Sequence, residues 1–199
     1  MPSVIKLLLV DDHMAVRAGL NVLLRAEPGL IGVGAFGGAP EALDAARREQ
    51  PDVVLVDYHL PDGDGLSLCR SLKRLQPPPA VLVYSAFASG RLALAALVAG
   101  ADGVLEKGAS ADELFDAIRN VAAGRPLSFF AAQEQFAVGA AALAAEDLPI
   151  LGMRAERIPV VEIASTLRVS PADVEARIDT MVQRLRPPIE PRIAAGAQL

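Results

Sequence analysis

The sequence predicts an α/β fold, in which a five-stranded, doubly wound parallel sheet is followed by a small all-α domain. Three observations predict it. Short apolar runs, most of them rich in β-branched residues, recur five times between Val4 and Leu105, and segments with helical spacing separate them. The runs are continuous rather than alternating, which is typical of parallel strands buried between two layers of helices. After an alanine-rich stretch, only helical patterns follow.

The five predicted strands are the apolar runs themselves. They lie at Val4–Val10, Leu30–Gly34, Val53–Val56, Ala80–Tyr84 and Gly103–Leu105. Parallel strands place their carboxyl ends along one edge of the sheet, and ligand sites of such sheets lie at that edge. The residues that directly follow each run are therefore the first candidates for a functional site.

Helices are predicted where apolar residues recur at helical spacing or where a start signal is present. The first helix carries four apolar residues on one face, namely Val16, Leu20, Leu23 and Leu24. Pro40 suits the first turn of a second helix over Glu41–Glu49. Ser110 and Glu113 have the spacing of a capping box. The helix that follows has one apolar face, formed by Leu114, Ala117, Ile118 and Val121.

Composition excludes several classes of protein. The chain has 199 residues and is 52% hydrophobic, which is enough for one ordinary domain and a small one. A net charge of −5 gives no general attraction to nucleic acid or to an anionic membrane. Cys69 has no second cysteine to pair with, and on an apolar helix face it is predicted to be a core residue rather than a reactive thiol.

The sequence also predicts a cytoplasmic protein without a membrane anchor. The apolar stretch near the N-terminus is too short for the core of a signal peptide. The uncharged segment Gln135–Ala145 is too short to span a bilayer.

Four parts of the chain differ in pattern. Residues 1–124 hold the repeated strand and helix pattern, and residues 125–146 lose it, which predicts a linker, either extended or helical. Residues 147–187 are predicted to form a helix-turn-helix-like output domain. Residues 188–199 have no clear pattern and are predicted to form a flexible tail.

Polar side chains follow four of the predicted strands. Asp11 and Asp12 follow the first strand, Asp57 the third, Ser85 the fourth and Lys107 the fifth. Any one of them has an ordinary explanation, because a single Asp after a strand is usually a helix cap or a turn residue and a single Lys is usually solvated. Five such residues at one edge of the sheet would need five coincidences.

The chemistry of this set indicates phosphoryl transfer. Three carboxylates close together repel one another, and hard oxygen ligands at this density suit Mg²⁺. The Lys107 ammonium and the Ser85 hydroxyl can each bind a phosphoryl oxygen. A carboxylate nucleophile in such a pocket forms an aspartyl phosphate.

Residues 4–123 resemble the receiver domain of two-component response regulators. The acidic pair Asp11–Asp12, the acceptor Asp57, Ser85 and Lys107 all match, and so does the D-x-x-x-P-x-x-x-G spacing that Asp57 opens. The resemblance implies a flavodoxin-like sheet and an Asp57 that accepts a phosphoryl group from a sensor histidine kinase. It also implies Mg²⁺ on Asp12, Asp57 and the His59 backbone carbonyl, with Asp11 acting directly or through water. Beyond self-catalysed phosphotransfer and dephosphorylation, no enzyme activity is implied.

Two further points refine this resemblance. A haloacid dehalogenase-like phosphatase also forms an aspartyl phosphate, but its second Asp lies two residues after the nucleophile, where this chain has His59 after Asp57 and His13 after Asp11. In most receivers an aromatic residue lies three positions before the lysine, and here that residue is Val104. We hypothesise that phosphorylation signals instead through movement near Arg91–Ala99, or is weakly coupled to output.

The C-terminal part resembles a degenerate LuxR-type output domain of the NarL/FixJ class. Ser170 can cap a helix whose first turn contains Pro171, and a short helix over Val161–Leu167 precedes it. The second helix has one apolar face, formed by Val174, Ile178, Met181 and Leu185. The family pattern is carried by Glu162, Ile163, Ala164, Leu167, Ser170 and Val174.

The charge of this second helix leaves two hypotheses open. Helices that bind DNA present basic groups to phosphates, whereas this helix carries Asp173, Glu175 and Asp179. If the chain is a phosphorylation-controlled transcription factor, the residues expected at DNA are Ser170, Arg177 and Arg184. The alternative is an output domain that does not bind DNA and instead binds protein, and the simplest alternative is a helical appendage that completes the fold. A homodimer is plausible through the apolar residues of 131–145 and of the helix over 111–123.

Overall fold

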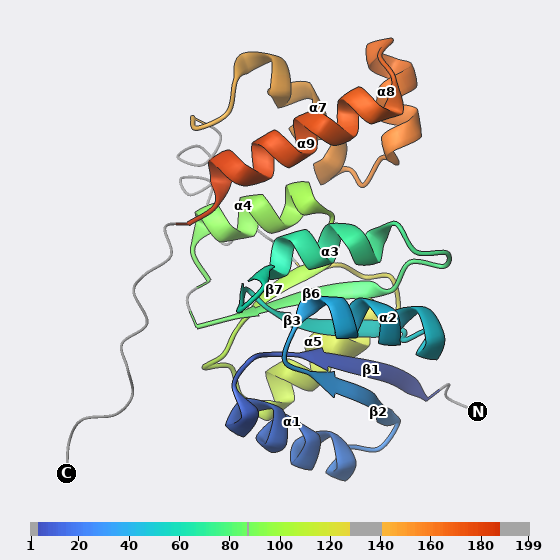
Figure 1. The fold of residues 1–199 in the computed structure, drawn as a ribbon, viewed down its shortest axis with the longest axis vertical. Helices are drawn as coiled ribbons and strands as arrows, with labels where there is room; N and C mark the ends of the chain where they lie inside the picture. The colour runs from blue at the N-terminus through green and yellow to red at the C-terminus, as the bar shows by residue number, and fades with distance from the viewer. Residues whose placement is uncertain (1–3, 87, 128–140, 188–199) are drawn as a thin grey trace, which may run out of the picture.

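The computed structural model describes residues 4–86, 88–127 and 141–187, and it shows the predicted five-stranded parallel sheet (Figure 1). The strand order is β2-β1-β3-β6-β7, the doubly wound order of a flavodoxin-like sheet. The strands are β1 Ile5–Val10, β2 Leu30–Phe36, β3 Val53–Asp57, β6 Ala80–Ser85 and β7 Gly103–Glu106. A small antiparallel pair, β4 His59–Leu60 and β5 Gly63–Asp64, follows β3. The predicted fold class is confirmed.

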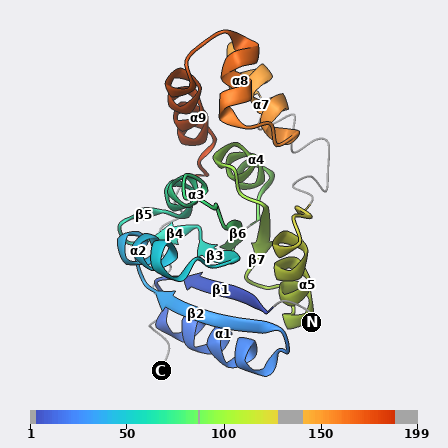
Figure 2. The same ribbon diagram turned by 90° about the vertical axis from the view of Figure 1, so that its right-hand side faces the viewer.

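Helices cover both faces of the sheet. They are α1 Met14–Ala26, α2 Ala39–Glu49, α3 Gly65–Lys73, α4 Gly90–Ala99 and α5 Ala111–Ala122. Figure 2 shows α1 and α5 on one face and α2, α3 and α4 on the other. Alternate residues of β1 enter two separate cores, because Leu7 and Leu9 pack with α1 and α5 whereas Leu8 and Val10 pack with α2 and α3. The strands are therefore buried on both faces, as their continuous apolar runs predict.

Local start signals act as the sequence predicts. Ser110 and Glu113 form a reciprocal capping box at α5, and Pro40 lies in the first turn of α2. Asp64 caps α3 by accepting a hydrogen bond from the Ser67 N–H. In α1 the prediction was only partly right. Leu20 and Leu24 are buried, but Leu23 is 40% exposed.

The C-terminal helices form a helix-turn-helix. After a short 3-10 turn over Ala145–Asp147 come α7 Leu148–Ala155, α8 Val160–Leu167 and α9 Pro171–Leu185. Ser170 caps α9 through a second capping box with Asp173. The apolar face of α9 is buried and consists of Val174, Ile178, Met181, Val182 and Leu185. Figure 1 shows α9 lying along α4, and its buried residues belong to the same core as the α2–α4 side of the sheet.

Several predictions concern residues outside those that the structure describes. Most of the 125–146 linker, the 131–140 part of the apolar segment and the 188–199 tail fall there. The apolar residues of α5 are described, and they are buried against the sheet. Cys69 is a fully buried core residue, as predicted, and burial raises its thiol pKa to about 12. Within the described ranges, no helix combines the length and the apolar character needed to cross a membrane.

Candidate functional site

The predicted site residues meet at the carboxyl edge of the sheet. Asp11 directly follows β1, Asp57 and Ser85 are the last residues of β3 and β6, and Lys107 follows β7. Lys107 Nζ donates to Asp11 Oδ2 at 2.6 Å and to Asp57 Oδ2 at 2.8 Å. Both carboxylates are only 2% exposed. One ammonium group therefore bridges two buried carboxylates that come from different strands.

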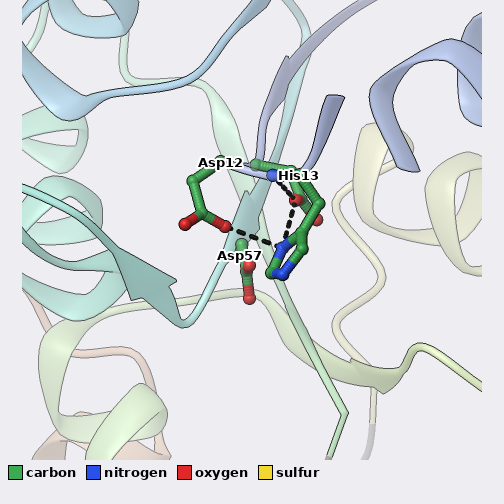
Figure 3. A group of neighbouring side chains, drawn as sticks. Asp12, His13 and Asp57 are labelled. Carbon is green, nitrogen blue, oxygen red and sulfur yellow. Dashed lines mark hydrogen bonds and ion pairs between the residues drawn. The ribbon is translucent and has the colours of Figure 1, made fainter. Parts of the chain in front are cut away.

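A cluster of possible metal ligands surrounds this bridge. Asp11, Asp12, His13 and Asp57 each offer a ligand atom, and these atoms all lie within 4.8 Å of one another. Figure 3 shows the His13 ring facing Asp12 beside Asp57, and its Nδ1 lies 2.7 Å from Asp12 Oδ1 and 3.3 Å from Asp11 Oδ1. Three carboxylates from two strand ends match the hard oxygen donors that Mg²⁺ prefers. The donor set therefore fits a divalent cation.

His13 is the one member of the cluster that the sequence did not point to as a site residue. The His13 backbone N–H donates to Asp11 Oδ1 at 2.7 Å, and His13 is the N-cap residue of α1. Its side chain is 54% exposed, so the imidazole covers the pocket from the solvent side. The available signal was its position directly after the acidic pair.

The loop after β3 explains the spacing between Asp57 and Gly65. The Gly65 N–H donates to the Tyr58 carbonyl at 2.8 Å, which closes the loop tightly against the end of β3. A Cβ on Gly65 would lie 2.2 Å from the Asp57 carbonyl oxygen, so only glycine fits. Within the same loop the His59 N–H donates to Asp57 Oδ1 at 3.2 Å. The His59 side chain itself is exposed, and β4 pairs His59 with Asp64.

Ser85 lies between Asp57 and Lys107, because β6 separates β3 from β7 in the sheet. Ser85 is 1% exposed, and its backbone carbonyl accepts a hydrogen bond from the Lys107 N–H at 2.7 Å. The neighbouring Tyr84 ring lies 5.8 Å from Lys107 Nζ, within the range of a cation–π contact. These contacts hold the lysine over the acidic pocket.

The electrostatics of the pocket follow from burial and from the lysine bridge. Burial raises the pKa of Asp57, with a smaller contribution from Asp11, although the bond to Lys107 acts in the opposite direction. Burial alone would lower the pKa of Lys107, but its hydrogen bonds to Asp11 and Asp57 outweigh this and raise it. At neutral pH Lys107 therefore remains charged, which keeps the carboxylates of this site together.

Comparison with known proteins agrees with this geometry. Residues 7–119 match the family described as the response regulator receiver domain. The chain belongs to this family. The transcriptional activator DevR/DosR of Mycobacterium tuberculosis is 42% identical over 123 residues, which are 62% of this chain and 57% of that protein. This match thus spans little more than half of that relative.

Two other relatives match a larger share of this chain. The transcriptional regulatory protein UhpA of Salmonella typhimurium is 34% identical over 178 residues, which cover 89% of each chain. A solved two-component response regulator of the LuxR family, from Aurantimonas sp. SI85-9A1, has a TM-score of 0.62 and 31% identity, and the match covers 68% of this chain and 97% of that one. The chain is thus a response regulator of the LuxR and NarL class.

The residues expected at DNA have other partners in this response regulator. The Ser170 hydroxyl is engaged in the capping box with Asp173. Arg177 donates to the Glu146 carbonyl at 3.4 Å, and Arg184 lies 3.4 Å from Asp147 Oδ2. Positions 170, 177 and 184 are seven residues apart and share one face of α9, where the two arginines contact Glu146 and Asp147.

The acidic residues of α9 face the receiver. Arg70 of α3 lies 2.5 Å from Glu175 Oε2 and 2.6 Å from Asp179 Oδ1, and Arg74 lies 2.8 Å from the same Glu175 oxygen. The two arginines and the hydrogen bonds that they donate lower the pKa of Glu175 against the opposing effect of its burial. The acidity of α9 thus has a structural explanation, since two of its three acids complement α3.

The end of α9 is held to the receiver by several contacts. Arg91 of α4 donates to the carbonyls of Leu185 at 3.1 Å and Arg184 at 2.6 Å. Arg186 lies 2.5 Å from Asp64 Oδ2, at the N-cap of α3. The Tyr58 hydroxyl, from the residue next to Asp57, donates to the Pro187 carbonyl at 3.4 Å.

Sequence reasoning missed this interface, although one signal was present. Every residue of α4 from Leu92 to Ala99 is buried. A helix that is apolar all round must be covered on every side. The sheet covers one side of α4, and α9 and α7 cover the other.

Proposed function

We propose that this chain is a cytoplasmic response regulator in which Asp57 accepts a phosphoryl group from a sensor histidine kinase in a Mg²⁺-dependent reaction. The observation that carries the proposal is the bridge of Lys107 to Asp11 and Asp57 beside a cluster of oxygen ligands. The phosphorylated chain would then control transcription through α8 and α9.

The chemistry assigned to each residue follows from its place in the pocket. The Asp57 carboxylate attacks the phosphorus of a phosphohistidine, so that a P–O bond forms as the P–N bond breaks and the imidazole recovers its electron pair. Lys107 exchanges its contact with Asp57 for one with a phosphoryl oxygen, and it stays anchored by Asp11. Mg²⁺, held by Asp11, Asp12, Asp57 and the His59 carbonyl, would neutralise charge on the phosphoryl group.

The proposed route to the output helix runs through α4. Ser85 ends β6, and α4 begins at Gly90, so a shift of Ser85 toward the phosphoryl group pulls on the start of α4. Arg91, in the first turn of α4, bonds the carbonyls at the end of α9. Val104 is partly buried against the same core as α4. This route needs no aromatic side chain at Val104, because α4 itself contacts α9.

Labelling with a small phosphodonor tests the acceptor. Acetyl phosphate with Mg²⁺ is expected to add one phosphoryl group to the wild-type chain, detected by intact mass. Asp57→Ala should abolish the addition, whereas Asp44→Ala, which removes an exposed carboxylate of α2, should leave it unchanged. Equal labelling of Asp57→Ala and the wild type would refute the assignment.

A second candidate function is an output domain that binds protein rather than DNA. One such partner is a second copy of this chain, which would give a homodimer. The protein-binding function is favoured by the use of Glu175 and Asp179 as receiver contacts and by the contacts of Arg177 and Arg184 with the Glu146 carbonyl and Asp147. DNA affinity depends on neutralised phosphates and falls with salt. A gel shift with upstream DNA, first at low salt and then at higher salt, separates the two. Absence of a shift at low salt with the phosphorylated chain would remove the DNA-binding function.

A further inference from the structure

A second cavity lies at the junction of the receiver and the C-terminal helices. Its volume is about 400 Å³, within the range of small-molecule sites. It lies beside the C-terminal ends of α3 and α4, whereas the acidic pocket lies at the carboxyl ends of the strands. It is thus a different site from the proposed phosphoacceptor pocket.

The lining of this cavity is strongly basic. Five basic side chains line it, namely Arg70, Lys73, Arg74, Arg154 and Arg157. Glu175 is the acid among the lining residues, and it is shared between Arg70 and Arg74. Lys73 and Arg157 both pair with Asp102, at 2.5 and 2.6 Å. Cations therefore outnumber the acids that pair with them.

Arg154 is the cation that has no partner among the described residues. Its Nε atom is buried and makes no hydrogen bond. A Cβ on Gly100 would lie 2.4 Å from one Arg154 terminal nitrogen, so the guanidinium lies directly against the glycine that ends α4. The C-terminal end of α4 offsets part of the charge. Burial, together with the nearby Arg70 and Arg157, lowers the pKa of Arg154, so an anion at this place would be favourable.

We propose that this cavity binds a small phosphorylated molecule, whose phosphate groups pair with Arg154 and with the guanidinium groups beside it. Guanidinium forks match phosphate oxygens in bidentate geometry, and several of them converge here. The apolar part of the wall, which includes Leu97, Val160 and Ile178, suits the remainder of an organic phosphate.

Such a ligand would contact both parts of the chain. Arg70 and Arg74 come from α3 of the receiver, whereas Arg154 belongs to α7 and Val160 begins α8. A ligand that binds only when both walls are in place stabilises their association. The proposed ligand is therefore an effector that favours the docked position of α9 and binds at a site separate from Asp57.

Calorimetric titration with inorganic pyrophosphate tests the site. The titration is done with the full chain, in EDTA and without Mg²⁺, against acetate at matched ionic strength. Pyrophosphate is expected to bind and acetate is not. Arg154→Met should weaken pyrophosphate binding at least tenfold. Arg48→Gln, which removes an exposed arginine of α2, and Asp57→Ala should both leave it unchanged.

Three results would overturn the proposal. These are no pyrophosphate binding at millimolar concentration, equal binding by Arg154→Met and the wild type, and equal loss in Arg48→Gln. If a DNA duplex binds in a way that depends on Arg154 while pyrophosphate does not bind, the cations serve DNA, and the proposal is again overturned. Thermal unfolding without ligand checks that Arg154→Met folds, and its midpoint should not fall, because the variant removes an unpaired buried charge. If it does not fold, Arg154→Lys replaces it, with an expected loss of binding that is smaller but measurable.

Discussion

The acidic pocket and the surface that holds α9 lie on the same receiver, but different levels of structure build them. In the pocket, Asp11, Asp57 and Lys107 meet because each ends or follows a parallel strand. At the α9 surface, Arg70 and Glu175 meet although 105 positions separate them in the chain, and nothing local requires it. The first arrangement follows from sheet topology, whereas the second depends on how two helical layers dock.

The difference has an energetic consequence. The pocket concentrates like charges and is held by one lysine, so its carboxylates repel one another unless a further cation binds among them. The α9 surface concentrates opposite charges around an apolar core. We therefore expect substitutions in the pocket to change chemistry, and substitutions at the α9 surface to change stability.

The largest effect is expected for Lys107→Met. The variant leaves Asp11 and Asp57 without their shared cation and removes a donor from the phosphoryl group, so the rate of phosphorylation by acetyl phosphate should fall by about 100-fold. The control is Lys6→Met, because the Lys6 ammonium donates to the Glu49 carbonyl on the other edge of the sheet, away from the pocket. A Lys107→Met rate within a factor of two of the wild type would show that the bridge has no chemical role.

The next largest effect is a difference in stability between variants of two arginines that bind the same acid, Glu175. Arg70→Met removes a side chain that is 9% exposed and leaves both Glu175 and Asp179 short of a partner, so the free energy of unfolding should fall by about 2 kcal/mol. Arg74→Met removes a side chain that is 55% exposed and should cost less than about 1 kcal/mol. Urea denaturation of both variants measures the difference, and equal losses would contradict the account of this surface.

A smaller effect is expected at the start of α4, which joins the two regions. The Ser89 side chain accepts a hydrogen bond from the Leu92 N–H at 3.2 Å, and loss of such a cap costs about 1 kcal/mol. Ser89→Ala should therefore lower the unfolding free energy by that amount, and Ser165→Ala, on the exposed side of α8, should not change it. If the two variants behave alike, the cap does not stabilise α4.

The smallest signal is expected from Cys69. Its thiol contacts the Ala99 carbonyl of α4 at 3.9 Å, and its pKa of about 12 keeps it protonated and unreactive well above neutral pH. At pH 8 an aromatic disulfide reagent should therefore label Cys69 of the native chain only as fast as the chain unfolds locally around it. The same reagent should label Cys69 of the urea-unfolded chain at once. Stoichiometric labelling of the native chain within seconds would mean that α3 and α4 separate readily.

The sequence predicted the regions of this protein unequally well. The parallel sheet, the capping box of α5, the Ser170 cap of α9 and the pocket residues were accessible because each depends on neighbours in sequence or on the general rule for parallel strands. His13 was missed because a histidine after an acidic pair has no distinctive spacing. The α9 surface was missed because Glu175 and Asp179 were considered as solvent-exposed charges, and pairing with Arg70 becomes visible only in three dimensions. The continuous apolar run Leu92–Ala99 was the one local clue.

The central claim is that the pocket and α9 are coupled through α4. Amide hydrogen exchange, followed by mass spectrometry with and without acetyl phosphate and Mg²⁺, tests it most directly. The account predicts faster exchange across Gly90–Ala99 and Pro171–Leu185 when the wild type is phosphorylated, and no change in Asp57→Ala. Phosphorylation of Asp57 that leaves the exchange of both helices unchanged would contradict the account.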